Sequence, residues 1–171
     1  LDLTRTQTPK ALNQELKVYY TLNEDHIFSF EAQHLDQTED PIGRAVRDRN
    51  PFLSLIPFDS NVQRFDITQN RFIETQKLEA KLDYFYLLND QSNINLSIGF
   101  TNVAQNYLSD FNQTLDDGTT KSFDDEQFNN NVDFSFKDLY FALNYRIRTG
   151  IFTIDPGLTL HFYDNKNTQL G

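Results

Sequence analysis

The sequence predicts an all-β fold of long antiparallel strands, and three observations support this prediction. Apolar and polar residues alternate over runs of about ten residues, the length of a strand that crosses a bilayer at a tilt. Tight turns and long polar connections join these runs alternately. Aromatic residues make up 14% of the chain, which favours strands over helices. Together they predict an antiparallel up-and-down transmembrane β-barrel segment, with about six long strands, short periplasmic turns and long extracellular loops.

The clearest hairpin spans residues 132–163 and turns at Thr149-Gly150. Before the turn the odd positions are apolar from Leu139 onward, and after it the even positions are apolar as far as Phe162. Such alternation on both sides of a glycine-containing turn is typical of a β-hairpin. The apolar parity switches at Lys137-Asp138, which predicts a β-bulge there.

Two further hairpins repeat this unit along the chain. They cover residues 14–35 and 72–103, with polar turns at 23–25 and 89–92. The remaining stretches lack a sustained period and are expected to be loops, over residues 36–71 and 104–131, with residues 1–12 as loop or a frayed strand end. The repetition assigns residues 1–171 to a single barrel domain, which we expect to be a segment of a longer barrel, since six strands are too few to close one.

Charged side chains on the polar faces of these hairpins are candidates for lining a wet lumen. A solute could meet them there, although pairing with neighbouring strands is the simpler role. These lumen-facing candidates are Lys77, Glu79, Lys81, Asp83, Arg146, Arg148, Asp155 and His161.

The first long loop carries arginines beside an apolar segment enclosed by two prolines. Arginine suits anionic groups and phenylalanine rings suit stacking, so this loop is a candidate for contacting a ligand. Packing of the rings against a plug or another loop would explain them equally well. The candidates are Arg44, Arg47, Arg49, Phe52 and Phe58.

A tyrosine precedes each tight turn on the apolar face: Tyr20, Tyr86 and Tyr145. A tyrosine ring faces lipid while its hydroxyl faces the headgroups. We therefore expect these residues to form a membrane girdle.

Composition argues against several other classes of function. The net charge of -10 makes a nucleic-acid backbone an unfavourable partner, and the absence of Cys removes disulfides and thiolate chemistry. The acidic residues 116–117 and 124–126 do not match an EF-hand loop, and the three histidines lack a metal-binding or catalytic spacing. We expect no enzyme activity, no metal and no cofactor.

The chain resembles the large outer-membrane β-barrels of Bacteroidota, of the TonB-dependent receptor type. The resemblance lies in the hairpin periodicity over residues 13–165, the turns LNEDH and LNDQSN, and the strand IDPGLTLHFY. It implies a place in the outer membrane of a Gram-negative bacterium and uptake of a solute. It also implies as partners the lipid bilayer, the remaining strands of the barrel or other subunits, a surface lipoprotein and an energy-coupling protein.

Two alternatives remain open at the level of sequence. The chain could be a structural barrel component of an outer-membrane complex without transport of its own. It could instead be a soluble antiparallel β-domain that binds a ligand, with its apolar faces packed inside. Dependence on detergent separates the membrane hypotheses from the soluble one.

Overall fold

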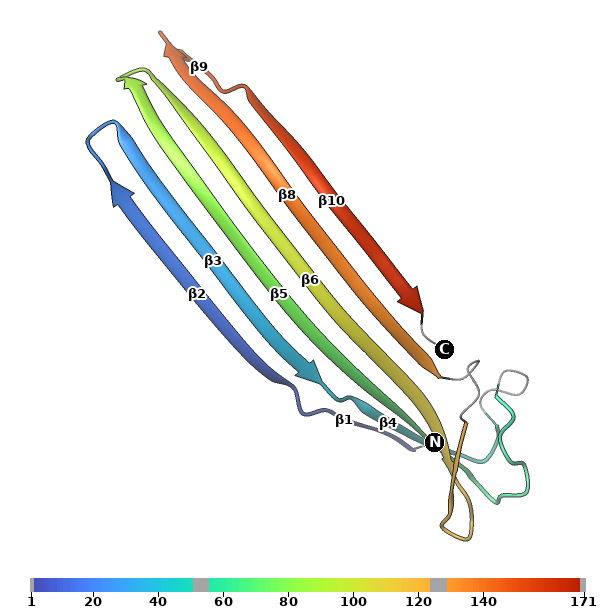
Figure 1. Cartoon of the computed structure of the whole chain (residues 1–171). Helices are drawn as coiled ribbons and strands as arrows, with labels where there is room; N and C mark the ends of the chain where they lie inside the picture. The colour runs from blue at the N-terminus through green and yellow to red at the C-terminus, as the bar shows by residue number, and fades with distance from the viewer. Residues whose placement is uncertain (1, 51–55, 124–128, 170–171) are drawn as a thin grey trace.

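The described part of the chain forms one antiparallel sheet in a computed structural model that covers residues 2–50, 56–123 and 129–169 (Figure 1). The short turns lie at one end of the sheet, and the long connections and both chain termini lie towards the other. No helix long and apolar enough to cross a membrane occurs in these ranges. The strands are β1 (Asp2–Thr6), β2 (Lys10–Thr21), β3 (His26–Glu39), β4 (Ile42–Arg47), β5 (Phe65–Asn89), β6 (Ser92–Thr114), β7 (Thr120–Ser122), β8 (Asn130–Thr149), β9 (Phe152–Ile154) and β10 (Gly157–Gln169).

Three prolines divide what are otherwise six long strands. β3 and β4 both pair with β5, and the register does not shift between them: Glu39 lies opposite Ile73 and Ile42 opposite Asn70. The break falls at Pro41, which has no N–H to give to the ladder. Pro9 separates β1 from β2, and Pro156 separates β9 from β10, in the same way.

The strands extend much further than the predicted hairpins, so the loops expected at 36–71 and 104–131 are too long. Part of the first is strand β4, and β5 begins at Phe65, seven residues before the expected Phe72. β6 continues to Thr114, and β7 adds a short strand within the second. The expected loop at residues 1–12 contains β1 and the start of β2.

The prediction of a β-bulge at Lys137-Asp138 is wrong. β8 pairs with β10 from Val132 to Asn144 without a shift in register, and with β6 equally regularly. The parity switches because the apolar side chains change from one face of the sheet to the other. Phe134 and Phe136 lie on the face opposite to Leu139, within one uninterrupted strand.

The sheet therefore has two faces of different character. The band face carries an apolar row across all six long strands: Val18, Phe30, Leu82, Ile98, Phe141 and Leu160. The polar face carries the neighbouring row: Lys17, Glu31, Lys81, Gly99, Tyr140 and His161. Along β5, band-face residues 72–78 are exposed and polar-face residues 73–79 are half-buried, as expected if the sheet curves around the polar face.

The buried hydrophobic cluster lies at the loop end, not in the middle of the sheet. It consists of Ile56, Phe58, Phe65, Ile67 and Phe123, with Val62 and Phe111 packed against it. Phe65, Ile67 and Phe111 belong to the polar face of β5 and β6. The first long connection is thereby folded down over the polar side of the sheet.

The sheet is open at both sides. β1 and β2 form one edge and β10 forms the other, and β2 is exposed along its whole length. The structure is thus all-β and antiparallel, as predicted, while the described strands do not close on themselves.

Candidate functional site

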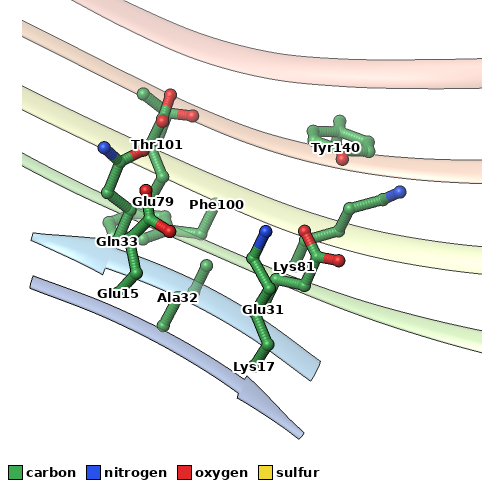
Figure 2. Close-up of a pocket in the computed structure, with 11 residues that line it drawn as sticks. Glu15, Lys17, Glu31, Ala32, Gln33, Glu79, Lys81, Phe100, Thr101 and Tyr140 are labelled. Atoms are coloured by element: carbon green, nitrogen blue, oxygen red, sulfur yellow. The ribbon is translucent and has the colours of Figure 1, made fainter. Parts of the chain in front are cut away.

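A depression of about 330 Å³ lies on the polar face near the middle of the long strands. Figure 2 shows its lining, which comes from β2, β3, β5, β6 and β8. The charged and polar side chains around it include Glu15, Lys17, Glu31, Glu79, Lys81 and Tyr140. Strand alternation explains this gathering, because every second residue of each strand points to the same side.

The lumen-facing candidates on β5 pair along their own strand. The ammonium of Lys77 lies 2.9 Å from the Glu79 carboxylate, and that of Lys81 lies 2.9 Å from the Asp83 carboxylate. The hydroxyl of Ser97 on β6 also donates to Asp83. The expected pairing with neighbouring strands is therefore wrong for the two lysines, whose partners are two residues away in sequence.

The remaining lumen-facing candidates form two more pairs. Arg146 donates to the Asp155 carboxylate at 2.6 Å, and Nδ1 of His161 lies 2.9 Å from Oδ2 of Asp138. The ring of Tyr140 lies beside His161, with 5.4 Å between ring centroids. Arg148 lies at the turn end of β8, where its backbone N–H donates to the carbonyl of Gln91. Alternation named three of the four residues in these two pairs but missed Asp138, because the predicted bulge had placed it out of phase.

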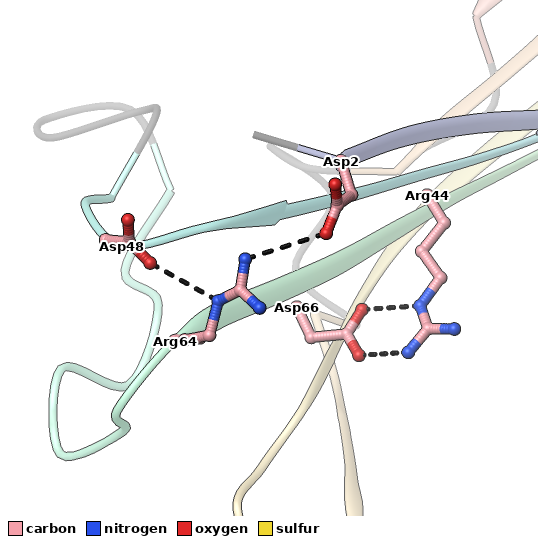
Figure 3. Close-up of polar contacts among 5 residues, drawn as sticks. All are labelled: Asp2, Arg44, Asp48, Arg64 and Asp66. Carbon is pink, nitrogen blue, oxygen red and sulfur yellow. Dashed lines mark hydrogen bonds and ion pairs between the residues drawn. The ribbon is translucent and has the colours of Figure 1, made fainter.

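The residues named as candidates for contacting a ligand lie partly in a strand and partly in the buried cluster. Arg44 and Arg47 lie in strand β4, and the guanidinium of Arg44 pairs with the carboxylate of Asp66 on β5 (Figure 3). This carboxylate raises the pKa of Arg44 above its ordinary value. Phe58 is only 7% exposed and packs in the buried cluster with Phe123 of the second connection, which agrees with the alternative of packing against another loop. Arg49 follows β4 in an exposed bend, and Phe52 lies outside the described residues.

Arg64 ties the loop end together in a way that the sequence did not indicate. Figure 3 shows its guanidinium between two carboxylates, 3.3 Å from Asp48 and 3.7 Å from Asp2. These groups come from the start of β1, the end of β4 and the entry to β5. The side chain of Arg64 is about half exposed and both carboxylates are more exposed still, so these ion pairs add little to the free energy of unfolding.

Gln113 is the one fully buried large side chain among the described residues. Its Nε2 donates to the carbonyl of Asp59 at 2.9 Å, and its Oε1 accepts from the Asp59 N–H at 2.7 Å. Gln113 thus holds the first connection to β6, and the second connection contacts the first where the carboxylate of Asp116 accepts from the Gln63 N–H. No sequence signal distinguished this glutamine from the polar residues around it.

The predicted girdle tyrosines lie on the band face near the short turns. Tyr86 and Tyr145 share one row, with Ile94 of β6 between them. Tyr20 lies in the adjacent row, which also contains Tyr84. The ring of His26 stacks on Tyr86 at 4.5 Å, and its Nδ1 lies 2.7 Å from the Tyr84 hydroxyl.

The acidic loop does not assemble a metal site within the part of the chain that the structure describes, where no group of three metal-ligating side chains gathers. Asp117 instead accepts hydrogen bonds from the backbone N–H and the hydroxyl of Thr119. Residues 124–126 lie outside the described ranges.

The fold and these contacts define an all-β protein: one open antiparallel sheet with an apolar face, a charged face and interlocked connections at one end. No protein family matches the sequence. A search among curated proteins also finds no significant match.

Proposed function

We propose that this sheet is a segment of an outer-membrane β-barrel transporter or receptor that takes up a solute in a TonB-dependent way. The observation that carries the proposal is the band face. Its apolar row crosses all six long strands and is exposed in this sheet, so in the native protein it is expected to contact another apolar surface. Exposed apolar surface on this scale marks an interaction with a membrane or a protein.

The height of the band favours a membrane. On β5 it runs from Leu78 to Leu88, which at about 3.4 Å per residue and a barrel tilt of about 40° gives roughly 25 Å. The apolar belt of outer-membrane barrels has about this height. The tyrosines at its turn end match the aromatic residues that flank such belts, on the side assigned to the periplasm.

The open edges supply a second argument. The backbone groups on the outer side of the edge strands β2 and β10 face no neighbouring strand in the described chain, and unpaired backbone groups are costly in lipid. The remaining strands of the barrel, or other subunits, would pair with them. The polar face would then line the lumen, and its mixed charges would meet a polar solute there.

TonB-dependence, a surface lipoprotein and an energy-coupling protein enter the proposal through the resemblance of the hairpins and turns. Growth of a deletion strain on a panel of nutrients tests the uptake. A growth defect of the deletion strain on one class of solute supports transport, provided that removing the energy-coupling protein from the wild type causes the same defect. Normal growth on every solute, together with purification in a stoichiometric complex, favours the structural barrel component.

Neighbouring residues on opposite faces test the membrane placement. This stretch of 171 residues contains no Cys, so Leu82→Cys and Lys81→Cys each introduce one labelling site into it. A fluorophore at position 82 should be quenched by nitroxides on lipid acyl chains. The same fluorophore at position 81 should escape this quencher, because its side chain points to the other face.

Gln76→Cys is the matched control, since it lies on the band face of β5 one position beyond Leu78, where the continuous apolar band ends. Its fluorophore should respond to iodide in water and not to the lipid quencher. Equal responses at positions 81 and 82, or protection of position 82 from both quenchers, would contradict the proposal and favour a soluble domain.

A further inference from the structure

The band face continues beyond the apolar belt, and a recess lies on this continuation. The recess has a volume of about 490 Å³ and spans β5, β6, β8 and β10. Ala104 and Ser135 lie opposite each other at its floor, with Gln76 on one side and Lys166 on the other. The recess exists because the small side chains of Ala104 and Ser135 lie between the longer side chains of Gln76 and Lys166.

Its walls are rich in hydrogen-bonding groups and poor in cations. Asn106 donates its amide to Asp133 at 2.7 Å, which fixes the carboxylate at the rim. Glu74 adds a second carboxylate and Lys166 the single cation among the lining residues that the structure describes. Two carboxylates beside one ammonium disfavour a phosphate, which binds where positive charge is in excess. Amide, hydroxyl and carboxylate groups together suit hydroxyl groups, which both donate and accept hydrogen bonds.

The depth of the recess also limits what can reach it. Its floor lies two rows beyond Phe100 and Leu139, the last row of the complete apolar belt. Two rows correspond to roughly 10 Å along the membrane normal for tilted strands, whereas the headgroup layer is about 5–8 Å thick on each side. A lipid occupying the recess therefore has a headgroup larger than a simple phosphate ester.

A separate apolar depression of about 240 Å³ lies within the belt on β6, β8 and β10. Leu96, Ile98, Phe141, Leu143, Leu158 and Leu160 contribute to it. The same strands thus offer an apolar hollow for acyl chains and a polar hollow beyond it.

We propose that the recess at Ala104 and Ser135 binds the sugar headgroup of a membrane glycolipid in the leaflet on the loop side, with its acyl chains along the apolar depression. This inference rests on the proposed membrane placement. It adds that the contact is selective for sugar hydroxyls over anionic headgroups.

The test places the complete native polypeptide in nanodiscs that contain phosphatidylethanolamine with equal small amounts of glucosyl-diacylglycerol and phosphatidylglycerol. The lipids that stay bound are counted by native mass spectrometry. The glucosyl lipid should be retained about tenfold over phosphatidylglycerol, the preference that two additional hydrogen bonds would give. Ala104→Phe fills the floor and should abolish the preference.

Two further variants keep the result interpretable. Gln14→Phe adds the same ring to the band face of β2, away from the recess, and should leave the preference unchanged. Asn106→Ala removes the amide that holds Asp133 without adding bulk, and should reduce it. Equal retention of both lipids, a preference for phosphatidylglycerol, or an unchanged preference in Ala104→Phe would overturn the inference. Quenching of the fluorophore at position 82 by lipid nitroxides, measured in the same nanodiscs, tests the membrane placement separately. If this quenching is present and the glucosyl lipid is not preferred, only the inference about the recess has failed.

Discussion

The ring of Tyr140 on β8 covers the backbone of Gly99 on β6. A Cβ built on Gly99 would lie 2.1 Å from Cε1 of the ring, a distance that no real side chain can occupy. Gly99 and Tyr140 are directly paired across the two strands. The ring supplies the apolar contact that glycine lacks in a strand, and it places the tyrosine at the rim of the polar depression beside His161.

This contact predicts energetic coupling between the two positions. In Gly99→Ala the new methyl group should displace the ring of Tyr140. Tyr140→Ala should therefore lower the free energy of unfolding less in the Gly99→Ala background than in the wild type. A double-mutant cycle should give a coupling free energy of about 1 kcal/mol. Urea unfolding of the four proteins in lipid vesicles measures it.

Gly43→Ala provides the matched control, because a Cβ at Gly43 meets no atom within 4 Å. The cycle between Gly43→Ala and Tyr140→Ala should show additive effects. Additivity in the Gly99 cycle as well would mean that the ring does not depend on the glycine.

The apolar band predicts that the cost of a charge depends on its position along β5. Leu82→Arg lies in the middle of the band and should lower the free energy of unfolding in lipid vesicles by about 2–4 kcal/mol. Gln76→Arg, on the same face and strand but beyond the band, should cost at most about 1 kcal/mol. Similar losses at both positions would argue against a membrane belt. Unfolding of Leu82→Arg in detergent-free buffer, with a soluble wild type, would identify position 82 as part of a soluble core.

The hairpins were predictable from sequence because apolar and polar residues alternate strictly wherever one face is exposed to a uniform environment. The same logic fails at the loop end. Beyond Leu78 the band face turns polar, while Ile73 and Phe134 make the polar face more apolar, so the alternation reverses and resembles loop or bulge. Strand pairing depends on backbone hydrogen bonds that continue across this reversal, and these leave no trace in hydrophobicity.

The site was predictable only in part for a related reason. Alternation assigned Lys81 and Asp83 to one face, but the contacts between loops depend on side chains far apart in sequence. The sequence left open whether Phe58 contacts a ligand or packs against another loop, and the ring packs edge-on against Phe123 with 4.9 Å between ring centroids. Gln113 has its partner in Asp59, a separation of 54 residues that no local pattern encodes.

The turn between β6 and β7 predicts a pH dependence. The N–H and hydroxyl of Thr119 donate to the Asp117 carboxylate at 2.9 and 2.6 Å, and they lower the pKa of this residue below the ordinary value of 3.8. The ionised carboxylate is the better acceptor, so the stabilisation of the turn is complete above this ordinary value. It is lost as the pH falls through the lowered pKa of the folded state.

Thr119→Val removes the hydroxyl donor and should shift the pKa of Asp117 upwards, whereas Thr119→Ser should leave it low. A carboxyl-carbon NMR titration of the three proteins measures the shift. Coinciding titration curves for the valine and serine variants would show that the hydroxyl does not hold the carboxylate.

The buried Gln113 of β6 predicts that the first long connection separates from the sheet when its amide is lost. In Gln113→Leu the half-buried Asp59 N–H and carbonyl lose their partner, at a cost of about 0.5–1.5 kcal/mol for each hydrogen bond. Hydrogen exchange at the Asp59 amide should accelerate, and the segment 56–64 should become accessible to protease, while the long strands stay protected.

Gln105→Leu is the control for this change on the same strand and the same face of the sheet. Its amide donates to the hydroxyl of Thr75, within the long strands and away from the connections. This variant should leave exchange at Asp59 unchanged. Wild-type exchange at Asp59 in Gln113→Leu would contradict this prediction. It would mean that the hydrogen bonds to Asp59 contribute nothing to holding the first connection over the sheet.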